Sequence, residues 1–502
     1  MTPGTLSAKH DARRWYEGCT HLGMRNAICL LLTAVLVGST ACATNPVTGK
    51  RQMSLLSEAE ELAIGQQQDA EIRREMGVYD DPALQAYVTE IGQDLARTSH
   101  RPNLPWTFTI VDSPVINAFA LPGGYIYITR GILAYLDDEA ELAGVLGHEI
   151  GHVTARHTAQ AYTRQAQANL GLTILSIFVP STRPFADLGA TGLEVLFLKH
   201  GRDAELEADR LGVEYGSSAG WDPSGVPRFL STLARVDALS EDGMPNWLST
   251  HPDPGSRVGR AEPVVGQFAS ASATKRNRDG YLDRIAGLVH GDNPKDGIVR
   301  GNVFLHPLLR LGLDFPQGWE VINSPEAVMA REPGTEHYMV LQEVEQPRGR
   351  SIGDAAVAAM RNAGYNVVDG RIEQINGQDA HLGLYRGTAK GAGTVMMRAA
   401  HVAVGRQLYV VAGFAPEAEF SLVDREVLPS IQSFRSLTAA EASRVHPNRI
   451  DFHVVRPGES WQSIAVRQGK NIVNAATLAI MNDHDANVQP QAGDRIKIVV
   501  EG

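Results

Sequence analysis

Residues 145–153 read Val-Leu-Gly-His-Glu-Ile-Gly-His-Val, and this stretch decides the fold. It lies within residues 137–157, whose apolar side chains recur at helical spacing and predict a helix. Because residues four apart share a helix face, His148 and His152 point the same way and can bind one Zn²⁺. Glu149, next to His148, can act as the base for the attacking water. One helical turn therefore predicts two metal ligands and a catalytic base.

A catalytic zinc site needs a third protein ligand. The extended motif with a third histidine would need Gly at 155 and His at 158, but the chain has Ala155 and Thr158. Residues 202–210 are predicted to be helical, and Glu205 and Asp209 share a face of that helix. We therefore expect Glu205 to bind the metal and Asp209 to accept a hydrogen bond from a ligand histidine. The prediction is one Zn²⁺ per chain.

Four nearby or similar residues are not assigned to this site. His157 is one residue out of register with the extended motif. Glu207 is expected to face solvent, because only Glu205 has an aspartate four residues later. His200 and His401 are interpreted as surface or structural histidines.

The composition excludes several function classes. The 502 residues are 43% hydrophobic and 21% charged, so the chain can bury ordinary cores and is expected to form two to four domains. A net charge of −11 without a basic block argues against nucleic acid as a partner. No cysteine follows Cys42, which removes a thiol mechanism from the body of the chain. A serine nucleophile lacks a supporting motif, because no Gly-x-Ser-x-Gly elbow occurs near a plausible base.

The N-terminal segment predicts export. Met24-Arg25-Asn26 precedes an apolar run and then small residues, which indicates a signal peptide over residues 1–41 with Met24 as a candidate start. The run is shorter than the roughly 20 residues of a membrane span. The segment resembles a bacterial lipoprotein signal with lipidation at Cys42, although Ser39 stands where Leu is usual. Ordinary cleavage with an incidental cysteine is the alternative. We expect a periplasmic protein anchored to the outer membrane by lipid at Cys42.

The fold class is predicted to be α+β with several domains. A mostly helical metal-binding domain with a small sheet is expected over residues 45–265, a linker over 266–300 and an α+β domain over 301–438. The apolar stretch 170–179 is expected to be a buried or surface-docking helix. Further expected elements are helices at 57–76, 81–97 and 202–215 and strands at 106–111 and 125–129.

The C-terminal residues 450–502 form a third unit. They include His-Val-Val-Arg-Pro-Gly-Glu at 453–459 and Gly-Asp-Arg-Ile-Lys-Ile at 493–498, and they resemble a LysM module. The resemblance implies a small βααβ fold that binds glycans rich in N-acetylglucosamine, with peptidoglycan as the candidate partner. A purely structural cap is the alternative.

The helical domain also resembles a known family. Asn-Ala-Phe-Ala-Leu-Pro-Gly-Gly at 117–124, the His-Glu-x-x-His motif and the segment from Glu205 to Asp209 occur in the order found in HtpX and BepA-like zinc metalloproteases. The resemblance implies a gluzincin fold, mostly helical, with a small sheet whose edge strand holds the substrate. Asn117 and Ala118 would lie at that edge and pair with the substrate backbone. A turn with a capping asparagine is the alternative.

A second family feature lies near the end of this domain. Ser-Thr-His-Pro-Asp-Pro at 249–254, followed by Arg257, resembles a His-Pro loop whose histidine approaches the zinc. His251 would then occupy the fourth metal position. Three roles stay open for it: a removable blocker, a stabiliser of the oxyanion, or a packing residue.

The predicted function is a zinc-dependent endopeptidase of the cell envelope that acts on protein or peptide substrates, in protein quality control by analogy. Zinc supplies Lewis-acid chemistry, and Glu149 takes a proton from water and passes it to the leaving amine. Two alternatives stay open. One is a peptidoglycan-bound scaffold or chaperone-like factor with a latent zinc site. The other is a cell-wall hydrolase that the C-terminal unit directs to its substrate.

Overall fold

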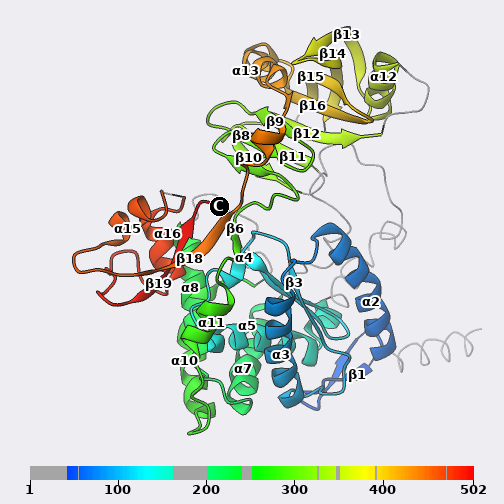
Figure 1. Cartoon of the computed structure of the whole chain (residues 1–502). Helices are drawn as coiled ribbons and strands as arrows, with labels where there is room; N and C mark the ends of the chain where they lie inside the picture. Colours follow the sequence, from blue (N-terminus) through cyan, green and yellow to red (C-terminus); the bar gives the residue numbers. More distant parts are fainter. Residues whose placement is uncertain are drawn as a thin grey trace, which may run out of the picture.

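The computed structural model describes residues 42–54, 56–161, 200–239, 251–324, 327–345, 351–389, 393–470 and 472–502. The expected signal peptide, the candidate start Met24 and the apolar stretch 170–179 lie outside these residues. The chain is an α+β protein that combines a helical region, which carries the predicted metal ligands, with several antiparallel sheets (Figure 1).

The helical region has the elements that the sequence periodicity predicts. Helix α5 begins where Asp138 accepts a hydrogen bond from the Glu141 amide, and it ends at Thr154. Every residue of α5 is buried. The elements of this region are β1 (Cys42–Thr44), β2 (Arg51–Met53), α2 (Glu58–Glu75), α3 (Pro82–Thr98), β3 (Thr107–Val111), β4 (Ala118–Leu121), β5 (Tyr125–Thr129), α4 (Arg130–Leu133), α5 (Glu139–Thr154), α7 (Arg202–Ser218), α8 (Gly225–Leu239), α10 (Pro254–Phe268) and α11 (Arg278–Arg284).

A three-stranded sheet lies beside α5 in the order β3-β5-β4. Strands β3 and β5 are parallel, whereas β4 pairs with β5 in antiparallel register, Ala118 opposite Ile128. Strand β4 is therefore an edge of this sheet, and it contacts α5. The edge strand begins one residue after Asn117.

Helices α5 and α7 approach closely because glycines line their contact. A Cβ atom on Gly212 would lie 3.0 Å from the backbone nitrogen of His148, and one on Gly151 would lie 3.1 Å from Ala208 Cα. Both distances are shorter than ordinary carbon contacts. Small residues therefore bring the helix with both histidines against the helix with Glu205.

Two further segments contribute to the core of the helical region. They are residues 266–300, which we expected to be a linker, and the C-terminal unit. Strand β6 (Val289–His290) pairs with β18 (Asn448–Val454), which pairs with β19 (Arg495–Val500). Helices α15 (Trp461–Arg467) and α16 (Ala475–Met481) join these two C-terminal strands, and Figure 1 shows the unit beside α8. One hydrophobic core contains residues of α5 together with Tyr281, Leu282, Ile285, Leu288, Ile450, Met481 and Val499.

The middle domain lies between β6 and β18 in the sequence. It has a seven-stranded antiparallel sheet, in the order β10-β11-β12-β16-β15-β14-β13, and a four-stranded sheet, in the order β17-β9-β8-β7. Its elements are β7 (Ile298–Arg300), β8 (Val303–His306), β9 (Leu311–Asp314), β10 (Glu320–Asn323), β11 (Ala327–Arg331), β12 (Tyr338–Val344), α12 (Ile352–Asn362), β13 (Asn366–Ile375), β14 (Gln378–Ala389), β15 (Gly393–Val404), β16 (Gln407–Pro416), α13 (Phe420–Gln432), β17 (Arg435–Ser436) and α14 (Ala439–Ala442).

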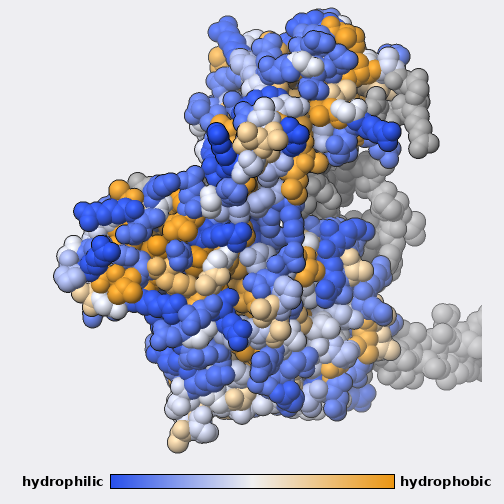
Figure 2. All heavy atoms as spheres, viewed as in Figure 1, coloured by the Kyte–Doolittle hydropathy of each residue, from blue (hydrophilic) through white to orange (hydrophobic). Residues whose placement is uncertain are grey.

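The surface is mostly hydrophilic on the face that Figure 2 shows, with apolar groups gathered over the C-terminal unit. Exposed apolar side chains of that unit include Val454, Val466 and Val488. Within the described ranges, no helix has both the length and the apolarity needed to cross a membrane.

Candidate active site

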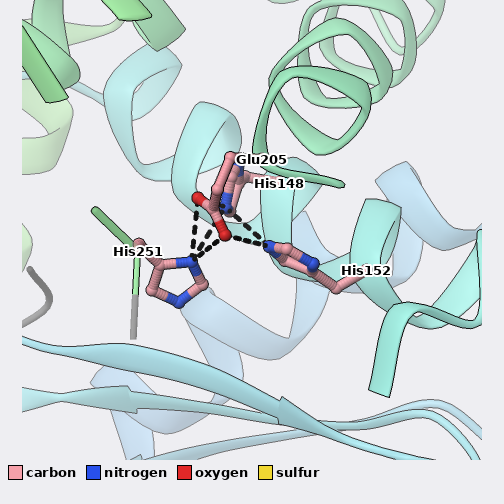
Figure 3. A group of neighbouring side chains, drawn as sticks. All are labelled: His148, His152, Glu205 and His251. Carbon is pink, nitrogen blue, oxygen red and sulfur yellow. Dashed lines mark hydrogen bonds and ion pairs between the residues drawn. The ribbon is translucent and has the colours of Figure 1, made fainter. Parts of the chain in front are cut away.

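The three predicted metal ligands meet in one buried group. His148 and His152 come from α5 and Glu205 from α7, and their side chains point toward one another (Figure 3). His148 Nε2 lies 3.0 Å from His152 Nε2, and the Glu205 carboxylate oxygens lie 3.6 and 3.5 Å from these two nitrogens. Two imidazoles and one carboxylate are a donor set typical of catalytic zinc. These residues fit Zn²⁺, as the spacing predicted.

The imidazoles are in the state that a metal requires. Burial lowers the pKa of His148, and it lowers the pKa of His152 further, with help from neighbouring histidines. Both rings are therefore neutral near pH 7 and have a lone pair for the metal. Within the described residues, this is the one group of His, Cys, Asp or Glu that could hold a metal ion, and it also includes His251.

Asp209 lies behind His148. Its Oδ1 is 3.0 Å from His148 Nδ1, and the Arg257 guanidinium donates to both Asp209 oxygens at 2.8 and 2.6 Å. Burial opposes ionisation, but the charge and hydrogen bonds of Arg257 hold the pKa of Asp209 at about 2. The carboxylate therefore accepts the Nδ1 proton of His148, which leaves His148 Nε2 for the metal. Arg257 also pairs with Glu205 at 2.7 Å.

Glu149 has the environment of a general base. Its side chain is buried, and burial together with the charge of Glu205 raises the pKa of Glu149 well above its usual value. Oε1 of Glu149 has no hydrogen-bond partner in the part of the chain that the structure describes. A buried oxygen of this kind, next to a ligand histidine, is available to a water molecule.

His251 contacts the whole site. Its Nδ1 lies 3.1 Å from Glu205 Oε1 and 3.3 Å from His148 Nε2, and its Nε2 lies 3.6 Å from Glu149 Oε1. The ring also hydrogen-bonds with the backbone of Ala118 at the start of β4. His251 therefore touches two metal ligands, the base and the edge strand.

Asn117 and Ala118 lie at the edge of the sheet next to this group. Ala118 is the first residue of β4. The side chain of Asn117 is buried, and its Oδ1 has no hydrogen-bond partner among the residues that the structure describes. Asn117 Oδ1 is thus a buried acceptor, next to the edge strand, that can accept a hydrogen bond from a further group.

Sequence reasoning missed three residues beside His152. His157 Nδ1 lies 2.9 Å from His152 Nδ1, and Glu207 Oε2 lies 3.2 Å from His157 Nε2, so Glu207 contacts a histidine where we expected it to face solvent. The ring of His200 stacks on that of His152 at 4.0 Å. Helical spacing could not reveal these contacts, because the chain leaves the helix after Thr154. His401, expected at the surface or as a structural residue, is buried in the middle domain.

A helix with His-Glu-x-x-His, completed by a glutamate from a second helix, is a zinc site typical of metallopeptidases. Residues 82–264 match the model of peptidase family M48. The chain is therefore a zinc metalloendopeptidase, and residues 82–264 are similar to peptidase family M48.

Two relatives illustrate the similarity. The beta-barrel assembly-enhancing protease of Escherichia coli strain K12 is 28% identical over 68% of this chain and 74% of its own length. The mitochondrial metalloendopeptidase OMA1 of Arabidopsis thaliana is 35% identical over 37% of this chain and 36% of its own length. The first alignment extends beyond the residues of the family match, whereas the second covers about the length of that match.

Proposed function

We propose that this protein cleaves protein substrates in the cell envelope as part of protein quality control. The observation that carries the proposal is Glu149, a buried base with an unused oxygen, next to two histidines and a glutamate that fit zinc. The name of the E. coli relative, a beta-barrel assembly-enhancing protease, supports envelope proteins as the substrate class. Unfolded outer-membrane proteins are the substrates that this relative suggests.

The chain's own residues supply positioning and proton transfer. Zinc, when bound, supplies Lewis-acid chemistry at the scissile carbonyl. Glu149 takes the proton of the attacking water and delivers it to the leaving amine. Strand β4 pairs with the substrate backbone through Ala118, and Asn117 Oδ1 accepts a hydrogen bond from a substrate amide.

The structure supports a closed resting state in which His251 blocks the site. The ring lies within hydrogen-bonding distance of Glu205 and bonds to the Ala118 backbone. A peptide that paired with β4 would have to displace this ring. The same observation favours the second candidate, a scaffold or chaperone-like factor whose zinc site is latent.

The N-terminal segment and the C-terminal unit suggest where the protein is located and what else it binds. The signal-like N-terminus supports export to the periplasm, with a lipid at Cys42 that anchors the chain to the outer membrane. The C-terminal unit has the order β18-α15-α16-β19, which agrees with the βααβ fold that the LysM resemblance implies, and peptidoglycan is proposed as its partner on that resemblance. Radiolabelled palmitate should label the wild type but not Cys42→Ser, and isolated sacculi should sediment the purified protein. A wild type that takes up no palmitate would rule out the lipid anchor. A protein that stays in the supernatant would rule out peptidoglycan binding.

The deciding experiment compares zinc-loaded wild type, Glu149→Gln and His251→Ala on casein and on an unfolded outer-membrane protein. Zinc content is measured for each preparation. We expect Glu149→Gln to lose activity by about 10³-fold or more with its zinc retained, and His251→Ala to gain activity. Zinc-loaded proteins that are inactive in all three forms would support the scaffold. Release of sugars or stem peptides from purified sacculi would support a cell-wall hydrolase.

A further inference from the structure

His152 has a hydrogen-bond partner of its own, separate from the one that Asp209 gives to His148. Helix α5 ends at Thr154, and Arg156 takes a left-handed conformation with φ of 60°. This turn brings His157 back over the end of the helix, where its Nδ1 lies 2.9 Å from His152 Nδ1. His157 Nε2 in turn lies 3.2 Å from Glu207 Oε2 on α7.

Metal binding by His152 fixes which group donates in each of these two hydrogen bonds, from His152 to His157 and from His157 to Glu207. When His152 Nε2 faces the metal, its Nδ1 must carry the proton and donate it to His157 Nδ1. His157 then carries its own proton on Nε2 and donates to Glu207, which accepts as a carboxylate. An apolar side chain such as phenylalanine or leucine could occupy this position but could not form these hydrogen bonds.

We propose that His157 and Glu207 are positioning residues that fix the tautomer and orientation of His152 and so set the zinc affinity of the enzyme. This inference rests on the metal site and not on the proposed substrate. Each ligand histidine thus has its own arm of hydrogen-bonded groups: Asp209 for His148, and His157 with Glu207 for His152. The carboxylates of these two arms differ in solvent exposure. The Asp209 side chain is 4% exposed and held by Arg257, whereas the Glu207 side chain is 26% exposed. The His152 arm therefore connects a metal ligand to the surface.

Helix α2 fixes the turn that makes this arm possible. Arg156 donates to Glu61 Oε1 at 2.7 Å and to the Leu56 carbonyl at 2.9 Å. Arg101 donates to Glu61 Oε2 at 3.4 Å and to the Val153 carbonyl at 3.3 Å. The Glu61 side chain is only 3% exposed. A segment upstream of the family match thus holds the end of the metal-binding helix.

Glu207→Gln tests the inference with a matched control on the same helix. Glu214 has a side chain 25% exposed and pairs with Arg210, so Glu214→Gln removes a similar charge away from the metal. Zinc affinity is measured by competition with a chromophoric chelator, and the ¹⁵N shifts of the His152 ring report its tautomer. We expect Glu207→Gln to weaken zinc binding by about 10-fold or more, and Glu214→Gln to leave it unchanged.

A second variant, His157→Phe, keeps an aromatic ring at this position, slightly larger than imidazole, and removes both hydrogen bonds. We expect it to lower zinc affinity by about 10- to 100-fold and to mix the His152 tautomers. If it does not fold, as judged by circular dichroism of the apoprotein, Glu207→Gln alone decides. Wild-type zinc affinity and an unchanged His152 tautomer in Glu207→Gln would overturn the inference. Because neither measurement uses a substrate, failure of the proposed function would leave this result intact.

Discussion

The ammonium nitrogen of Lys497 lies 3.8 Å from Asp137 Oδ1, and the same nitrogen donates to the Leu136 carbonyl. Lys497 is completely buried in β19, although Lys is among the residues least often buried. Asp137 lies just before α5, the helix that carries both ligand histidines. A C-terminal strand therefore contacts the start of the metal-binding helix.

We expect Lys497→Met to destabilise the protein. The substitution keeps the apolar stem, but it leaves a buried carbonyl without its donor and removes one cation from Asp137, which keeps Arg278. The free energy of unfolding should fall by roughly 2 kcal/mol or more, measured by urea denaturation. Lys470→Met is the control, because Lys470 is 73% exposed and pairs with Glu501 at the surface. Equal stability of the two variants would contradict this role of Lys497.

The Asp137 contacts also predict a pH dependence. Burial alone would raise the pKa of Asp137, but Lys497 and Arg278 hold it below its usual value of 3.8. A depressed folded-state pKa gives stability that is present above about pH 4 and is lost as the pH falls through the folded pKa. The stability difference between wild type and Asp137→Asn should be constant from about pH 5 to 7 and shrink below about pH 4. Urea denaturation measures this stability difference. A chelator is added to both proteins so that loss of zinc at low pH does not contribute to it.

The sequence predicts the parts of this protein that depend on local spacing. His148 and His152 are predicted because one helical turn separates them, and Glu205 is predicted because Asp209 follows it by one turn on α7, whose predicted start is correct. Contacts that depend on distant partners were not visible. Nothing in the local pattern shows that Tyr281 packs in the metal-binding core or that Lys497 is buried.

The contact between His157 and His152 is a second example of a feature that the sequence does not predict. The periodicity predicts a helix to residue 157, but the left-handed Arg156 ends it and turns His157 toward His152. The side chain of Arg156 hydrogen-bonds with Glu61 in another helix. A single sequence carries no signal for such a contact, so His157 was assigned no role.

We expect Gly212→Ala to separate α5 from α7. The added methyl group would lie 3.0 Å from the His148 backbone nitrogen, so α7 must shift and carry Glu205 away from the histidines. Zinc affinity should fall several-fold, and stability should fall by about 1–3 kcal/mol, measured by chelator competition and by denaturation. Gly216→Ala is the control on the same helix, since its methyl group meets nothing within 4 Å. An alanine there should be neutral or stabilise the helix by up to about 1 kcal/mol. A Gly212→Ala variant that binds zinc as well as Gly216→Ala does would refute the expected shift.

We expect Glu61→Gln to loosen the end of α5. Glutamine keeps the shape of the side chain, but it leaves Arg156 without its charge partner and Arg101 with only the exposed Glu58, a change that costs about 3 kcal/mol of stability. The turn at Arg156 should become mobile, and zinc should dissociate faster into excess chelator. Glu71→Gln is the control on the same helix, because Glu71 is 39% exposed and pairs with Arg74. Equal dissociation rates in the two variants would show that α2 does not hold the site.

The sharing of one core by α5 and the C-terminal unit has a consequence for biosynthesis. Chains are synthesised from the N-terminus, at about 5–20 residues per second. The middle domain, inserted between β6 and β18, must emerge before Lys497 can reach Asp137. The helix with the ligand histidines is thus synthesised long before the strand that completes its surroundings. A nascent chain would therefore carry the complete set of metal ligands before Lys497 can reach the start of the helix that holds two of them.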